Sequence, residues 1–154
     1  MKGNPDVLDI LNQVLQNHHA AYMQFWKNSI YLKERGYDKL AEEQRQDGKT
    51  ERHSMADIAY RIQFLEGDPT FDQMGEVYLT GEYRTILENN LKQHMHSLET
   101  LRTAVKTAND VQDYGSRDLV NEILKAKEAR VDAVEDEIEK YDRLGEQVYL
   151  STKV

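Results

Sequence analysis

Apolar residues recur every three or four positions along most of this chain, a spacing that places them on one face of an α-helix. Glycine and proline interrupt the pattern at a few points, such as Gly36 and the sequence Gly67-Asp68-Pro69, where helices are expected to end. The pattern predicts four long helices, over residues 6–34, residues 38–66, residues 82–108 and the segment between Ser116 and Gly145.

The connections between these helices differ in length. The first and last links are short and predict two antiparallel helical hairpins, whereas residues 70–81 mix apolar and polar positions without a lasting period and predict a long ordered connection. Two hairpins joined by one long crossover form the ferritin-like bundle. We therefore predict an all-α, ferritin-like four-helix bundle that occupies residues 1–154 as a single domain, with a short C-terminal helix over residues 146–152.

Composition agrees with this class and excludes several kinds of site. The 154 residues are 39% hydrophobic and 31% charged, with only eight glycines and two prolines, which favours long helices over disorder. The absence of cysteine excludes disulfides, thiolate zinc sites and iron–sulfur clusters. A net charge of −8 disfavours nucleic acid and anionic membranes as partners, and the chain carries no apolar run of spanning length, so we expect a cytoplasmic protein.

Each apolar stripe is interrupted near the middle of its helix by a polar residue. The interruptions are His18 on the first helix, Asp47, Glu51 and Ser54 on the second, His94 on the third and Lys127 on the fourth, and they would meet inside the bundle. Unpaired charges there are costly, so a compensating partner is required. One hypothesis is a mononuclear site for iron or another divalent metal at His18, Glu51 and His94.

The alternative, which the sequence favours, is a structural network without metal. Glu51 would pair with Lys127 or Arg130, because cations at these positions oppose a divalent ion. The two histidines would be neutral and would form hydrogen bonds with Asn90, Ser54 or water.

Several segments resemble bacterioferritins, in register from residue 1 to about residue 150. The segments that carry this resemblance are Met1-Lys2-Gly3-Asn4, Leu11-Asn12-Gln13-Val14-Leu15, Arg61-Ile62-Gln63-Phe64-Leu65-Glu66-Gly67-Asp68-Pro69, Asp113-Tyr114-Gly115-Ser116-Arg117-Asp118-Leu119, Glu122-Ile123-Leu124 and Tyr149-Leu150. The resemblance implies a shell-forming iron-storage subunit with a di-iron ferroxidase site and haem between subunits.

The residues that this resemblance would assign to iron and haem are largely replaced. The family's di-iron site uses a Glu on the first and third helices and Glu-x-x-His on the second and fourth. The matching positions hold His18, Glu51 with Ser54, His94, and Lys127 with Arg130, so only Glu51 fits. We therefore expect ferroxidase activity to be lost. Haem is not expected, because Arg52 occupies the position of the family's methionine ligand and Met55 lies one turn further on.

The outer faces of the first two helices predict a partner surface. An apolar strip on the first helix lies beside a cationic strip on the second, and Gly48 suggests that another chain approaches closely. We expect a protein partner or a second copy of the chain to bind there, through His19, Met23, Trp26, Ile30, Arg45, Lys49, Arg52 and Met55.

The sequence is compatible with three functions. The first is a non-enzymatic structural or protein-binding scaffold, either a non-catalytic subunit of a mixed shell or a redesigned bundle. The second is an iron-storage shell subunit, and the third is the mononuclear metal-binding bundle. Enzymes of other classes are disfavoured, because the chain has no phosphate-binding glycine loop, no helical His-Glu-x-x-His and no nucleophile elbow.

Overall fold

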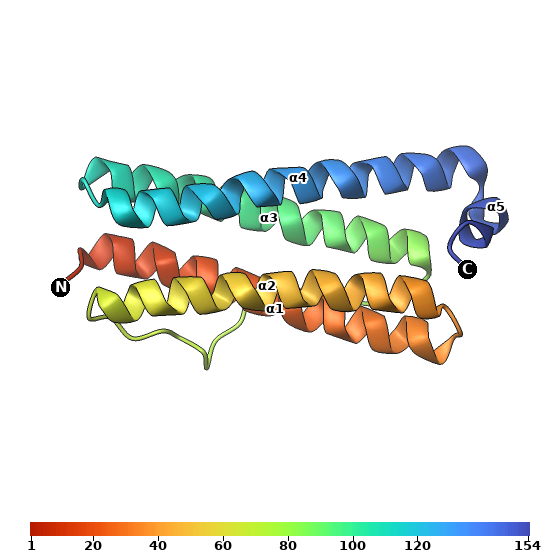
Figure 1. Ribbon diagram of the computed structural model, residues 1–154, viewed down its shortest axis with the longest axis horizontal. Coiled ribbons are helices and arrows are strands. Elements are labelled where there is room, and N and C mark those ends of the chain that lie inside the picture. The colour runs from red at the N-terminus through yellow and green to blue at the C-terminus, as the bar shows by residue number, and fades with distance from the viewer.

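The computed structural model describes all residues from Met1 to Val154 and contains five helices. They are α1 (Pro5–Glu34), α2 (Asp38–Phe64), α3 (Tyr83–Asp110), α4 (Tyr114–Leu144) and α5 (Glu146–Ser151). The four long helices form the predicted all-α, ferritin-like bundle, and α5 is the predicted short C-terminal helix (Figure 1). No helix combines the length and the apolar character that crossing a lipid bilayer requires.

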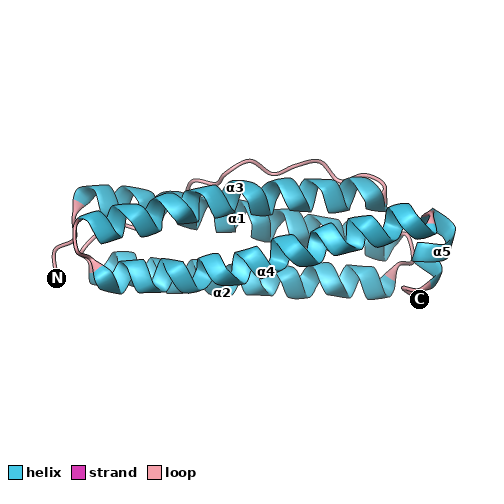
Figure 2. Ribbon diagram, turned by 90° about the horizontal axis from the view of Figure 1, so that it is seen from above, coloured by secondary structure: helices cyan, strands magenta, loops and turns pink.

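The bundle consists of two antiparallel hairpins, α1 with α2 and α3 with α4 (Figure 1). The hairpins pack mainly through α1 and α3, whereas α2 and α4 have little backbone contact with each other. The long connection before α3 runs along the outside of the bundle, where α1 and α3 lie (Figure 2). It is held by α1 through a hydrogen bond of 3.1 Å from the Gly75 amide to the Gln16 carbonyl. Helices α2 and α4 are therefore the neighbouring pair whose backbones approach each other least.

The apolar core is divided into two clusters by a polar layer. One cluster of 14 buried residues, which includes Leu11, Ile62 and Leu101, fills the end of the bundle near the N-terminus. A second cluster of 8 residues, which includes Leu40 and Tyr149, fills the opposite end, where α5 docks. The polar residues that interrupt the apolar stripes lie between these clusters, as the pattern predicts.

Two helix boundaries differ from the expected ones. Helix α4 begins at Tyr114, so the Tyr114-Gly115-Ser116 segment expected to precede it forms its first turn. The reason is Asp113, whose side chain accepts a hydrogen bond from the Ser116 amide and caps the helix. Helix α2 ends at Phe64, two residues early, because Glu66 adopts a left-handed backbone conformation with a φ of 62°.

Candidate functional site

The structure brings the four central polar residues together, one from each long helix. His18 of α1, Glu51 of α2, His94 of α3 and Lys127 of α4 are all buried, with at most 4% of each residue exposed. Each lies about halfway along its helix, so antiparallel packing places all four at one level of the bundle. We call these four residues the central layer.

An ion pair joins α2 to α4 within the central layer. The ammonium of Lys127 donates a hydrogen bond to Oε1 of Glu51, and its nitrogen also lies 3.3 Å from Nδ1 of His94. Burial opposes ionisation of Glu51, but the positive charge of Lys127 and its hydrogen bond to the carboxylate outweigh it and lower the pKa of this carboxyl to about 2. Glu51 is therefore ionised and paired, which confirms the predicted Glu51–Lys127 partnership.

Both histidines of the central layer are neutral. Burial lowers the pKa of His18, and burial together with the charge of Lys127 lowers the pKa of His94 to about 3. Nδ1 of His18 donates to the Val14 carbonyl at 2.9 Å, which leaves its Nε2 as an acceptor. That nitrogen lies 3.6 Å from Oε2 of Glu51, and neither atom has a hydrogen-bond donor in the chain.

Arg130 does not pair with Glu51. It reaches Asp47 instead, with 3.0 Å between its guanidinium and Oδ2, at the rim of the central layer. Burial raises the pKa of Asp47 to about 6, and the attraction of Arg130 offsets this only in part. The expected hydrogen bonds from the histidines to Asn90 or Ser54 are also absent, because His18 binds a backbone carbonyl and His94 contacts Lys127.

Beside the central layer lies a network of buried amide side chains that sequence reasoning missed. Its amide groups bond to one another over 2.8–3.2 Å and come from three helices, as Gln24, Asn28, Gln44, Asn90 and Gln93. Gln24 also accepts from the Tyr78 amide, which fixes the long connection to the bundle. The signal in the sequence was the pair of amides at positions 24 and 28, which lie one turn apart on the same face of the first helix.

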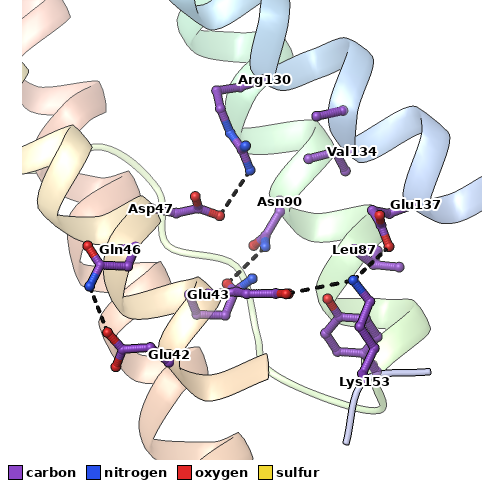
Figure 3. A pocket seen from close by; sticks show the side chains of 13 residues that line it. Glu42, Glu43, Gln46, Asp47, Leu87, Asn90, Arg130, Val134, Glu137 and Lys153 are labelled. Atoms are coloured by element: carbon purple, nitrogen blue, oxygen red, sulfur yellow. Dashed lines mark hydrogen bonds and ion pairs between the residues drawn. The ribbon is translucent and has the colours of Figure 1, made fainter. Parts of the chain in front are cut away.

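A cavity of about 380 Å³ opens between α2 and α4, on the side where these helices are apart (Figure 3). Its polar lining is internally paired: Asp47 binds Arg130, and Lys153 lies between Glu43 at 3.7 Å and Glu137 at 3.4 Å (Figure 3). The cavity therefore offers few free groups to a ligand.

A family model described as a ferritin-like domain matches residues 8–144. Bacterioferritin of Rhodobacter capsulatus is 30% identical over 147 residues, which cover 96% of this chain and 91% of that protein. Bacterioferritin of Brucella melitensis is 28% identical over 149 residues, 97% of this chain and 92% of the relative. The chain belongs to the bacterioferritin family.

The similarity extends over the whole three-dimensional structure. A solved structure of Rhodobacter capsulatus bacterioferritin matches with a TM-score of 0.98 and 28% sequence identity, and covers 100% of this chain and 96% of that one. That structure was determined with a metal-free dinuclear site and with haem iron in a crystallographic special position.

The central layer of this bacterioferritin homologue does not fit a pair of iron ions. Glu51 is its only carboxylate, whereas two irons need several carboxylates to balance and bridge their charge. The Lys127 ammonium occupies the space beside that carboxylate, and no group of three or more His, Cys, Asp or Glu side chains is arranged to hold a metal ion.

The residues at the haem position do not fit haem either. Arg52, at the position of the methionine ligand, extends over the Tyr22 ring with 5.9 Å between its guanidinium carbon and the ring centroid. Met55 is buried in the apolar core rather than on the outer face where the partner surface was predicted, because it packs with the cluster near the N-terminus. Neither side chain offers a thioether at the surface.

The other predicted partner-surface residues lie at or near the outer face of α1 and α2. Trp26 and Ile30 are 50% and 59% exposed, and the Trp26 ring stacks on Tyr22 with 6.1 Å between centroids. His19 and Met23 are half-buried, and His19 lies 3.2 Å from the Gln73 carbonyl of the long connection. The exposed cations that border the aromatic residues are Arg45, Lys49 and Arg52.

Proposed function

We propose that this chain is a non-catalytic member of the bacterioferritin family, a structural subunit that associates with other chains through the outer face of α1 and α2. The observation that carries the proposal is the Lys127–Glu51 ion pair, which occupies the centre of the bundle. An ammonium bonded to the single carboxylate leaves no ligand set for the oxidation of ferrous iron.

The association surface is supported by exposed side chains that a solitary domain gains little from displaying. Trp26 and Ile30 are large, apolar and about half exposed on neighbouring turns of α1. The groove between Trp26 and α2 is lined by three cations, Arg45, Lys49 and Arg52, and by Gly48, where a Cβ would lie 3.5 Å from the Tyr22 ring. Aromatic residues with arginine beside them are the composition typical of protein interfaces.

Catalysis and association are tested separately. We expect the purified protein to oxidise ferrous iron in air no faster than buffer does, followed by the absorbance of ferric iron. Catalysed oxidation that saturates with iron would contradict the non-catalytic assignment.

Association is tested by the solution mass, measured by light scattering after size exclusion. We expect Trp26→Asp to lower the mass of the assembly, because the substitution places a charge in the apolar centre of the proposed contact. Met95→Asp is the matched control, since Met95 is 44% exposed but lies on α3. Equal masses for the wild type and Trp26→Asp would show that the interface lies elsewhere.

Iron storage as a shell subunit is the second candidate, favoured by the near-complete match to a bacterioferritin subunit. Lacking an oxidation site of its own, such a subunit would take mineral formed by partner subunits or by slow uncatalysed oxidation. Electron microscopy after iron loading distinguishes the two candidates. Hollow particles with dense cores support storage, whereas small particles without mineral support the structural role.

A further inference from the structure

The ammonium of Lys127 lies where it contacts two other helices of the bundle. We infer that the Lys127 ammonium takes the place of a metal ion in the central layer, and that its charge keeps the layer closed to divalent metals. The inference deepens the proposed non-catalytic function and rests on it, but its experiments measure stability and metal binding rather than association or iron oxidation.

Lys127 connects α4 to the other three helices, directly or through Glu51. Lys127 extends from α4, donates to Glu51 of α2 and lies 3.3 Å from Nδ1 of His94 of α3. The second oxygen of Glu51 faces Nε2 of His18 of α1 at 3.6 Å. One ammonium and one carboxylate thus connect the two hairpins on the side where α2 and α4 otherwise have little contact.

The charge of the central layer opposes the binding of a divalent ion. The central layer holds one ammonium, one carboxylate and two neutral imidazoles, so its net charge is zero. A divalent ion added to it would leave two positive charges uncompensated beside Lys127, in an interior where charges interact strongly. Metal binding therefore requires that Lys127 leave or lose its charge.

Each imidazole of the central layer lies almost as close to the Glu51 carboxylate as two ligands of one metal ion lie to each other. Ligands on one tetrahedral metal ion are about 3.3 Å apart, given bonds of about 2.0 Å. Nε2 of His18 lies 3.6 Å from Oε2 of Glu51, and Nδ1 of His94 lies 3.9 Å from Oε1, so each imidazole is a few tenths of an ångström farther from its nearer carboxylate oxygen than this spacing. Replacing Lys127 with a carboxylate would then complete a set of two imidazoles and two carboxylates, a donor set suited to zinc or cobalt.

The stability arm of the test compares Lys127→Met with the double variant Glu51→Met, Lys127→Met. Removing only the ammonium leaves a buried unpaired carboxylate, and we expect the melting temperature to fall by about 10 °C. The double variant fills the layer with two apolar side chains, and we expect it to regain most of that loss. A Lys127→Met protein as stable as the wild type would overturn the inference.

The metal arm uses Co²⁺ as the probe, because its visible absorption reports tetrahedral coordination. The wild type should show no tetrahedral absorption, and its melting temperature should be the same in Co²⁺ and in EDTA. In EDTA, Lys127→Glu should melt at a lower temperature than the wild type does. Co²⁺ should raise the melting temperature of this variant and give it the tetrahedral spectrum. The matched control, Lys127→Glu with His18→Ala, should lose that spectrum.

Each result decides for or against the inference. Bound Co²⁺ or melting that responds to EDTA in the wild type would overturn it, as would a folded Lys127→Glu protein without affinity for Co²⁺. If Lys127→Glu does not fold, Lys127→Ala is used, whose three remaining donors should bind Co²⁺ more weakly. No stabilisation of that variant by Co²⁺ would equally overturn the inference.

Discussion

The guanidinium of Arg61 donates a hydrogen bond of 2.8 Å to Oδ1 of Asp113, and so joins the last turn of α2 to the residue that caps α4. Nε of Arg61 also donates to the Ser116 hydroxyl at 2.9 Å. These residues belong to the segments that carry the resemblance to bacterioferritins. The sequence thus resembles bacterioferritins at the residues that join the two hairpins and differs from them in the central layer.

Gly115 lies directly under the Arg61 guanidinium, which leads to our first prediction. A Cβ at Gly115 would lie 2.6 Å from a terminal nitrogen of Arg61, which Asp113 holds in place. Gly115→Ala should therefore lower the free energy of unfolding by about 1–2 kcal/mol, because it displaces a charged hydrogen bond. Urea denaturation measures this change.

Gly48→Ala is the matched control, with the opposite expected sign. A Cβ at Gly48 would meet Tyr22 at 3.5 Å, an ordinary contact, so the substitution should raise the free energy of unfolding by about 0.5–1 kcal/mol. Gly115→Ala should also become harmless once Arg61→Met has removed the guanidinium. If it stays destabilising in that background, the clash with Arg61 is not the cause.

The second prediction concerns the pH dependence of stability at Asp47. The charged groups around it are Arg130 and Lys127 from α4 and Glu51 and Glu43 from its own helix. Its pKa is raised by burial from 3.8 to about 6, so the folded state binds its proton more tightly than the unfolded state. The stability that this proton contributes is complete below pH 3.8 and is lost as the pH rises through about 6.

Asp47→Asn removes this titration while keeping an oxygen that accepts from Arg130. We expect the variant to be at least as stable as the wild type at neutral pH. Between pH 4 and pH 6, its free energy of unfolding should fall less than that of the wild type. Thermal melts across this range measure the slope, with Asp132→Asn on the exposed face of α4 as the control. Identical slopes for Asp47→Asn and the wild type would exclude a raised pKa at this carboxyl.

The fold could be predicted from the sequence because its determinants are local and periodic. Apolar residues at helical spacing and the Gly67-Asp68-Pro69 break identify the helices and the crossover. The central layer was also predictable, because one polar interruption at the middle of each stripe must meet the others in an antiparallel bundle. Lys127 opposite Glu51 then follows from the cost of an unpaired buried charge.

The details that could not be predicted depend on side-chain direction rather than on spacing. Arg130 is one turn from Lys127, but only the packed bundle directs it to Asp47 at the rim. Met55 resembles a surface residue in the sequence because it lies one turn beyond Arg52, yet it faces the core. The buried amides escaped notice because asparagine and glutamine are usually exposed.

The third prediction tests whether the amide network holds the long connection. Oε1 of Gln24 accepts from the Tyr78 amide at 3.0 Å and from Gln93 at 2.8 Å. Gln24→Met leaves the Tyr78 amide without its acceptor and leaves Gln93 bonded only to the Glu76 carbonyl. The substitution should lower the free energy of unfolding by about 2 kcal/mol and speed protease cleavage within residues 70–81. The control is Gln13→Met, on an exposed position of the same helix. Equal cleavage rates in both variants would show that other contacts hold the connection.

The last prediction concerns how α5 closes the end of the bundle. Tyr149 is 1% exposed, its hydroxyl donates to Glu137, and its ring packs on Tyr141 and Tyr83 with centroids at 5.2 Å and 5.9 Å. Tyr149→Phe keeps the ring and should cost about 1 kcal/mol, because Lys153 still compensates Glu137.

Tyr149→Ala removes the ring as well and should cost about 3–5 kcal/mol, the range for large aromatic residues in cores. Urea denaturation of the two variants therefore separates hydrogen bonding from packing, with Val148→Ala, 52% exposed on the same helix, as the control. Similar losses for the Phe and Ala variants would mean that the hydroxyl, rather than the ring, holds α5. We expect Tyr149→Ala to cost much more than Tyr149→Phe. Such a difference would show that α5 is part of the second core cluster, because the buried Tyr149 ring joins α5 to α3 and α4.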